Sequence, residues 1–194
     1  MRRLLIFALA FCAGLFLPHA LGLHNPFRAP LAATGGTAGG SSLTQRPGAS
    51  IAVYFSPGGG CTAAIVAAIN QSSRSIYVQA YSFTSAPIAR ALVSAARRGV
   101  VVYVILDKSQ RTEHYSSATY LAHAGIPVWI DAAHRIAHNK IMILDASTVI
   151  TGSFNFTRAA EYDNAENLLI IHSPQLAAIY ARNWTLHRHH STPY

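Results

Sequence analysis

The run from position 138 to position 155 combines residue types that suit phosphodiester chemistry. It holds an imidazole and an amine two residues apart, a carboxylate five residues further on, and then a glycine, a hydroxyl and an amide. These residues are His138, Lys140, Asp145, Gly152, Ser153 and Asn155. A neutral imidazole can attack phosphorus and form a covalent phosphohistidine. A fixed ammonium can stabilise the negative charge that builds up on the non-bridging oxygens in the transition state.

The pattern of apolar residues predicts how these side chains are positioned. The run opens with alternating apolar residues and reads as a strand, in which residues two apart point to the same face. His138 and Lys140 should therefore project together. Ser153 and Asn155 share a face in the same way, and we expect both to bind the substrate phosphate with Lys140. Gly152 beside them predicts a close approach of two backbone segments.

Two carboxylates complete the predicted site. Asp145 lies an odd number of residues from His138, so it leaves the shared face where the strand ends. We expect Asp145 to brace the following turn or to hold a neighbouring side chain, and not to touch the substrate. Glu166 precedes a later apolar strand, and we interpret it as the acceptor for the second ring N–H of His138, which would fix the tautomer of the imidazole.

The charged residues favour a reaction without a metal ion. Two-metal nucleases hold their ions with clustered carboxylates, whereas this chain has seven Asp and Glu in total and a lysine at the centre of the motif. We therefore expect no metal and no cofactor. The reaction also needs a second, protonated imidazole that releases the leaving alkoxide. Because the motif occurs once, the simplest source is His138 of a second copy in a two-fold homodimer.

On these residues the chain resembles the phospholipase D superfamily, and in particular its small bacterial Nuc-type endonucleases. The similarity extends from about Ile51 to His172 and so goes well beyond the motif. The resemblance implies a role for each matching position. By this resemblance the nucleophile is His138, the phosphate-binding residues are Lys140 and Asn155 with Ser153 beside them, the structural acid is Asp145, and the acid that orients the imidazole is Glu166.

Several other features are expected to be structural. Tyr81 and Phe83 could line a substrate groove, but we expect them to pack in the core or at its rim. Glu161 should be a solvated loop or helix-end charge. The glycine-rich run at residues 56–61 resembles a phosphate-binding loop but lacks the Lys-Ser/Thr ending, so a strand-to-helix turn is expected. The histidines between positions 187 and 190 could bind a metal ion, but they are expected in a disordered polar tail.

The amino terminus has the pattern of a secretory signal peptide. Two arginines precede an apolar stretch from Leu4 to Leu17, and Ala20 and Gly22 supply small residues at the cleavage positions. The stretch is short for a membrane span, although an uncleaved anchor is an alternative. We expect residues 1–22 to be a signal peptide, and the protein to be periplasmic or secreted without stable membrane insertion.

Composition sets the domain boundaries and the class of partner. Residues 23–47 are rich in Gly, Ala, Ser, Thr and Pro and predict a flexible linker, so a folded domain is expected at 48–194. The formal charge of the whole chain is +8, and loss of the two signal arginines leaves a basic protein. A basic chain favours a polyanionic partner, which is either nucleic acid or an anionic lipid surface.

Strand and helix patterns alternate through the predicted domain, which indicates an α/β fold. We expect a phospholipase D-like sandwich, with a mixed β-sheet flanked by helices on both faces. Helices are predicted at 62–70, 87–98, 116–124 and 174–187. Strands are predicted at 51–55, 75–82, 100–106, 127–130, 137–144, 148–151 and 168–171.

Three functions remain open from the sequence. The first is an exported, metal-independent endonuclease acting on DNA or RNA. The second is a phospholipase D-type hydrolase of anionic phospholipids, which would need an apolar entry or interfacial loop; the sequence has no Trp- or Leu-rich loop near the motif. The third is a non-catalytic nucleic-acid-binding protein that keeps the fold, which the intact motif disfavours.

Overall fold

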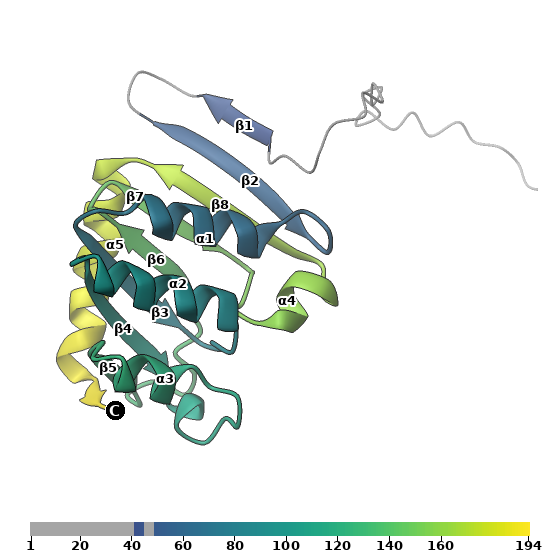
Figure 1. The fold of residues 1–194 in the computed structure, drawn as a ribbon. Helices are drawn as coiled ribbons and strands as arrows, with labels where there is room; N and C mark the ends of the chain where they lie inside the picture. The colour runs from purple at the N-terminus through teal and green to yellow at the C-terminus, as the bar shows by residue number, and fades with distance from the viewer. Residues whose placement is uncertain (1–40, 45–48) are drawn as a thin grey trace, which may run out of the picture. The chain divides into compact units, whose positions relative to one another are not determined.

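One mixed sheet of nine strands organises the described part of the chain, and its order is β1-β2-β8-β7-β6-β3-β4-β5-β9 (Figure 1). The computed structural model describes residues 41–44 and 49–194. β3, β4 and β5 are mutually parallel, and every other neighbouring pair is antiparallel. The strands are β1 (Ser41–Thr44), β2 (Ser50–Ser56), β3 (Ser75–Ala80), β4 (Val101–Asp107), β5 (Val128–Asp131), β6 (Lys140–Leu144), β7 (Thr148–Gly152), β8 (Glu166–His172) and β9 (Thr192–Pro193).

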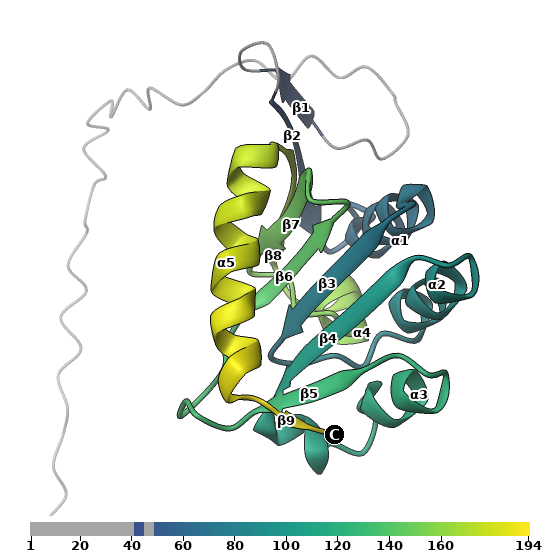
Figure 2. The same ribbon diagram turned by 90° about the vertical axis from the view of Figure 1, so that its left-hand side faces the viewer.

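Helices cover both faces of this sheet, as the sequence predicted. Figure 2 shows α1, α2 and α3 on one face and α5 on the other. Parallel neighbours need crossover connections, and α2 and α3 supply them between β3, β4 and β5. The helices are α1 (Cys61–Gln71), α2 (Ala86–Arg97), α3 (Ala118–His123), α4 (Arg158–Tyr162) and α5 (Pro174–His190), with a 3-10 turn, η1, at Lys108–Arg111.

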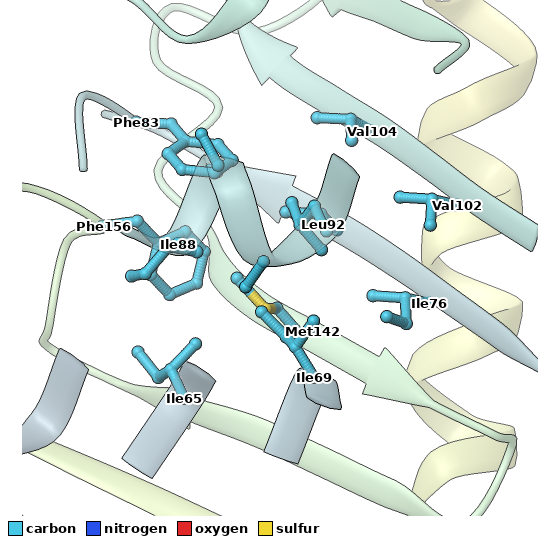
Figure 3. Packing of buried hydrophobic residues seen from close by; sticks show 14 of the residues in the cluster. Ile65, Ile69, Ile76, Phe83, Ile88, Leu92, Val102, Val104, Met142 and Phe156 are labelled. Carbon is cyan, nitrogen blue, oxygen red and sulfur yellow. The ribbon is translucent and has the colours of Figure 1, made fainter. Parts of the chain in front are cut away.

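The larger hydrophobic core lies between the sheet and the helices α1, α2 and α3. Ile69 of α1 and Leu92 of α2 meet Met142 of β6 there, and all three side chains are fully buried (Figure 3). Val104 of β4 joins this core, whereas its neighbour Ile105 points into the layer under α5. The continuous apolar run of β4 is therefore buried on both faces, which is what a central strand requires.

A smaller core fixes α5 against the opposite face of the sheet. The indole of Trp184 stacks on Tyr77, with ring centroids 5.0 Å apart, and on Tyr103, with centroids 6.3 Å apart. The indole N–H also donates to the backbone oxygen of Val78 at 2.9 Å, so the ring is both packed and hydrogen-bonded. This contact holds the carboxyl-terminal half of α5 on the sheet.

Two segments at the ends of the domain differ from the sequence expectations. Ser41–Thr44, inside the expected linker, form β1, which pairs with the edge of β2. The histidines from 187 to 190 are the last turn of α5 and not a disordered tail, because Trp184 anchors the helix before them. The expected signal peptide and the rest of the linker lie outside the described residues. Among the described helices, none is long and apolar enough to cross a membrane.

Candidate active site

All the predicted site residues except Asp145 meet at one end of three interior strands of the sheet. β6, β7 and β8 are antiparallel neighbours, so the start of β6, the end of β7 and the start of β8 lie side by side. Lys140 begins β6, Gly152 ends β7 and Glu166 begins β8. An open pocket of about 460 Å³ lies at these strand ends. Its lining residues are His138, Lys140, Gly152, Ser153, Asn155 and Glu166.

His138 and Lys140 face each other across this pocket. The Nζ atom of Lys140 lies 3.1 Å from Nε2 of His138 and also donates to the backbone oxygen of His138 at 3.1 Å. The strand begins at Lys140, not at residue 137 as expected, so His138 lies in the loop before it. The two side chains nevertheless line the same pocket. The predicted alternation holds within β6, because Ile141 and Ile143 pack under α5 on the other face.

Ser153 and Glu166 form a second polar pair across the pocket. The hydroxyl of Ser153 donates to the Glu166 carboxylate at 2.5 Å and accepts from the backbone N–H of Asn167 at 3.1 Å. The amide of Asn164 donates to the other Glu166 oxygen at 3.0 Å. Among the hydrogen bonds of the described residues, none joins Glu166 to His138. The expected pairing of these two side chains is therefore not formed within one chain, because Ser153 and Asn164 occupy the carboxylate.

Gly152 allows the strands to close around the pocket. Its φ is 145°, and a Cβ atom at this position would collide with the backbone oxygen of Asn167. That oxygen accepts from the N–H groups of Ser153 at 3.1 Å and Phe154 at 3.2 Å. The close backbone approach predicted at Gly152 is confirmed, and its consequence is that β7 and β8 hold Ser153 in place.

The electrostatics of Lys140 suit a group that must bind and release a phosphate. Burial lowers the pKa of its ammonium, and the nearby Glu166 carboxylate acts in the opposite direction, with a net lowering. Because an ammonium can donate to Nε2 only when that nitrogen carries a lone pair, the contact with His138 is compatible with a neutral, nucleophilic imidazole. Lys140 and His138 thus form a direct polar contact at the wall of the pocket.

Asn155 supplies a polar group without a partner inside the chain. Its Oδ1 atom is buried and makes no hydrogen bond, whereas buried polar side-chain atoms normally have one. The residue also lines the pocket. A ligand at this position would satisfy the amide of Asn155, as the sequence expectation of phosphate binding requires.

The ring of Tyr81 packs against the imidazole of His138. Its ring lies 4.7 Å from the ring of His138, and the Lys140 ammonium lies 5.4 Å from the centre of the same tyrosine ring. The neighbouring Phe83 is fully buried in the core. Of this aromatic pair, Tyr81 contacts the site, as the alternative interpretation of a substrate groove suggested, whereas Phe83 packs in the core as expected.

Asp145 lies outside the pocket, just past the opposite end of β6 and five residues after Lys140, which is roughly 17 Å of extended chain. Its carboxylate accepts from the backbone N–H groups of Ser73 at 2.9 Å, Arg74 at 2.8 Å and Ser75 at 2.9 Å. Burial would raise the pKa of Asp145, but these hydrogen bonds outweigh it and lower the pKa. The contacts agree with the bracing role expected for this residue.

The glycine-rich run before α1 does not form a second phosphate site. The backbone N–H of Thr62, in the first turn of α1, donates to Glu161 at 2.6 Å. Glu161 is buried, so the expectation of a solvated charge is wrong. A carboxylate already occupies the helix terminus where a phosphate would bind.

Comparison with known proteins identifies the family. The domain described as "Cardiolipin synthase, PLD-like domain" matches residues 65–185. Phospholipase D of Rickettsia typhi is 43% identical over 143 residues, which are 74% of this chain and 70% of the relative. Mitochondrial cardiolipin hydrolase of Xenopus laevis is 33% identical over 113 residues, which are 58% of this chain and 54% of that protein.

Two solved structures have the same fold as this chain. The crystal structure of Nuc from Salmonella typhimurium, a phospholipase D family member, superposes with a TM-score of 0.73 at 40% identity and covers 75% of this chain and 98% of that one. NucT from Helicobacter pylori has a TM-score of 0.71 at 22% identity, covering 75% and 99%, and shows the shared fold alone. The chain belongs to the phospholipase D superfamily and is one of its phosphodiesterases.

Proposed function

We propose that this protein is an exported, metal-independent endonuclease that hydrolyses nucleic-acid phosphodiester bonds through a covalent phosphohistidine. The observation that carries the proposal is the 3.1 Å approach of the Lys140 ammonium to Nε2 of His138 in an open polar pocket. A phosphate bound there would have one non-bridging oxygen on Lys140 and its phosphorus before the imidazole. Preorganised charge of this kind is the largest contribution to catalysis in many enzymes.

The proposed reaction has two steps. In the first, the Nε2 lone pair of His138 forms a bond to phosphorus, the bond from phosphorus to the leaving oxygen breaks, and an imidazolium protonates that oxygen. In the second, the imidazole that protonated the leaving oxygen is now neutral and removes a proton from water. The water oxygen attacks phosphorus, and the bond between phosphorus and Nε2 of His138 breaks. Lys140 and Asn155 would bind the non-bridging oxygens in both steps.

The second imidazole is proposed to come from another copy of the chain. Within the described residues, His138 is the single histidine that lines the pocket. A C2 homodimer, the commonest symmetry of soluble oligomers, would place two copies of His138 in one cleft. The pocket is open to solvent on the single chain, which leaves room for such an arrangement.

Nucleic acid is favoured over lipid by charge and by the pocket lining. The chain carries a formal charge of +8, and none of the six residues around the described pocket is an apolar residue that could hold an acyl chain. The resemblance to Nuc-type endonucleases, together with the match to nearly all of Nuc from Salmonella typhimurium, supports the same choice.

A phospholipase D activity on anionic lipids is the second candidate. It is favoured by the Rickettsia relatives named phospholipase D and by Ile136, which is half exposed two residues before His138. A single exposed apolar side chain is common on soluble proteins and does not make an acyl-binding wall. Lipid cleavage therefore remains the outcome that the substrate comparison below would reveal.

One substrate comparison tests this function. Purified protein and its His138→Ala variant would be incubated with plasmid DNA, with RNA and with vesicles of anionic phospholipid, each in excess chelator. Cleavage of a nucleic acid by the wild type alone supports the proposal. Release of lipid head groups without nucleic-acid cleavage would replace it with the second candidate, and binding without any cleavage would favour a non-catalytic nucleic-acid-binding protein.

Export is proposed from the sequence of the first twenty-two residues. Intact-mass measurement of protein from the periplasm or the medium should show that these residues have been removed. A full-length protein that fractionates with membranes would support an uncleaved anchor instead.

A further inference from the structure

Three histidines surround one buried carboxylate at the opposite face of the sheet from the large core. Asp131 ends β5, His134 follows in the loop after it, and His187 and His190 lie one turn apart on α5. None of the four lines the catalytic pocket. Nδ1 of His187 lies 2.7 Å from the Asp131 carboxylate, and Nε2 of His190 and Nδ1 of His134 each lie 3.2 Å from it.

The geometry of this cluster is close to that of a tetrahedral metal site. Four donor atoms, one from each residue, all lie within 4.8 Å of one another. The three imidazole rings form an almost regular triangle, with centroid separations of 5.0, 5.2 and 5.2 Å. A tetrahedral zinc ion with bonds near 2.0 Å separates neighbouring donors by about 3.3 Å, so small side-chain movements would close the site.

Asp131 is present as a ready anionic ligand. Its side chain has no exposed surface, and burial alone would raise its pKa. Hydrogen bonds from His187, His134, His190 and the backbone N–H of Ala133 outweigh this effect and lower the pKa to about 2. Its contacts with the three imidazoles place one carboxylate oxygen beside three nitrogen donors, which is the set that a metal ion would need here.

We propose that Asp131, His134, His187 and His190 bind one divalent transition-metal ion, with zinc as the preferred occupant. Three imidazole nitrogens and a carboxylate oxygen are a donor set that zinc favours. Four protein ligands fill a tetrahedral shell, so the role is structural and not catalytic. The partly exposed imidazoles of His134 and His190, at 46% and 37% exposure, give the ion a path from solvent.

The site would connect two segments that are distant in sequence, residues 131–134 and residues 187–190. His187 and His190 belong to the end of α5, Asp131 to β5, and His134 to the loop that leads to the nucleophile four residues later. The ion would therefore stiffen the loop that carries His138 and fix the last turn of α5. It takes no part in the chemistry, so the proposal does not conflict with a metal-independent reaction.

Metal uptake by untagged, full-length protein tests the proposal. After removal of bound metal with a chelator, the protein would be titrated with zinc, and bound zinc and the melting temperature would be measured. We expect one zinc per chain, and at a zinc concentration a hundred times Kd a rise in melting temperature of roughly 5 to 10 °C. Copper and nickel titrations would rank the competing ions.

Matched variants locate the bound ion. The His187→Gln/His190→Gln double variant should lose both the zinc and the metal-dependent rise in melting temperature. His189→Gln, an exposed neighbour in the same turn, and His138→Ala in the catalytic pocket should both retain them. The readout is the change caused by zinc in each variant, because removing two donors from a buried carboxylate lowers stability even without metal.

Two results would contradict the proposed metal site. Wild-type protein that takes up no zinc, or a double variant that responds to zinc as the wild type does, would leave only a carboxylate–imidazole hydrogen-bond network. Should the double variant not fold, the absorption spectrum of cobalt-loaded wild type decides. Bands of a tetrahedral cobalt site support the proposal, and the spectrum of hydrated cobalt contradicts it.

Discussion

The Nζ atom of Lys140 lies 3.1 Å from Nε2 of His138, so the fixed cation and the proposed nucleophile already share one position for a phosphate. The ring of Tyr81 packs against both groups, 4.7 Å from the ring of His138 and 5.4 Å from the Lys140 ammonium. The pair comes from a loop end and the first residue of β6. Rigid placement of this kind is what lowers the barrier of a phosphoryl transfer.

Replacing His138 should abolish turnover and leave the fold intact. His138→Ala and His138→Asn remove the atom that bonds to phosphorus, so kcat/KM should fall by about a thousandfold or more. His123→Ala, at an exposed position on α3, is the matched control and should keep wild-type activity. A folded His138→Ala protein that cleaves at the wild-type rate would rule out the phosphohistidine.

Replacing Lys140 should cost less than replacing the nucleophile but remain severe. Lys140→Ala removes a preorganised cation from the transition state, and kcat should fall by about a hundredfold. Lys140→Arg keeps the charge but changes its shape and should restore part of the loss. Lys108, the other lysine of the chain, lies outside the pocket, so Lys108→Ala should have little effect. Equal losses in both alanine variants would contradict the role of Lys140.

Replacing Asp145 should lower stability and spare chemistry. Asp145→Ala leaves three backbone N–H groups without their charged acceptor, and the free energy of unfolding should fall by on the order of 3 kcal/mol. Urea unfolding measures this loss, and assays at low temperature should show nearly unchanged kcat. A stable Asp145→Ala protein with no activity would instead place Asp145 in the reaction.

The same carboxylate gives a pH dependence with a definite sign. The pKa of Asp145 is lower in the folded protein than in the unfolded chain. Its contribution to the free energy of unfolding is therefore fully present above the unfolded pKa, near 3.9, and is lost as the pH falls through the folded pKa. The stability difference between wild type and Asp145→Asn should therefore shrink below about pH 4. A difference that stays constant down to pH 2 would show that the charge of Asp145 is not involved.

The motif itself predicted most of the pocket, because spacing along a strand fixes which side chains share a face. Gly152 likewise revealed a backbone approach that its φ of 145° now explains. The partner of Glu166 could not be predicted in this way. It depends on the register of β7 and β8, which pairs Gly152 with Leu168 and so brings Ser153 onto the carboxylate. Register between strands is a tertiary property that local spacing does not contain.

The sequence suggested that the histidines near the end of the chain could bind a metal ion, but their partners Asp131 and His134 could not be predicted, for the same kind of reason. His187 and Asp131 are 56 residues apart, and tertiary contacts such as that of Trp184 with the sheet and the pairing of β9 with β5 bring the end of α5 over β5. The alternation of strand and helix patterns did predict the α/β sandwich, since each pattern reports its own buried face. What it could not predict was where a polar helix end would meet a buried carboxylate.

Chelators should leave the reaction intact while changing stability. The described pocket holds one carboxylate, that of Glu166, and Lys140 occupies the place where a metal ion would otherwise meet the phosphate charge. Initial rates well below the melting temperature should be equal with and without excess chelator. Loss of activity in chelator that magnesium restores would contradict the metal-independent mechanism, and zinc-dependent stability alone would not.

The proposed shared cleft can be tested by a quantitative mixing experiment. If one His138 attacks and the other protonates the leaving group, a dimer with one His138→Ala chain has lost one of the two required imidazoles. Wild type and variant would be unfolded together in equal amounts and refolded, so that chains assort at random. About a quarter of the dimers should then carry two intact chains. Because the added variant doubles the total number of dimers, the activity should fall to about half that of the same amount of wild type alone. Activity that stays at the level of the wild-type chains added would mean that each chain works alone. Sedimentation of the same samples should show dimers at the assay concentration, and full activity from a monomer would refute the shared site.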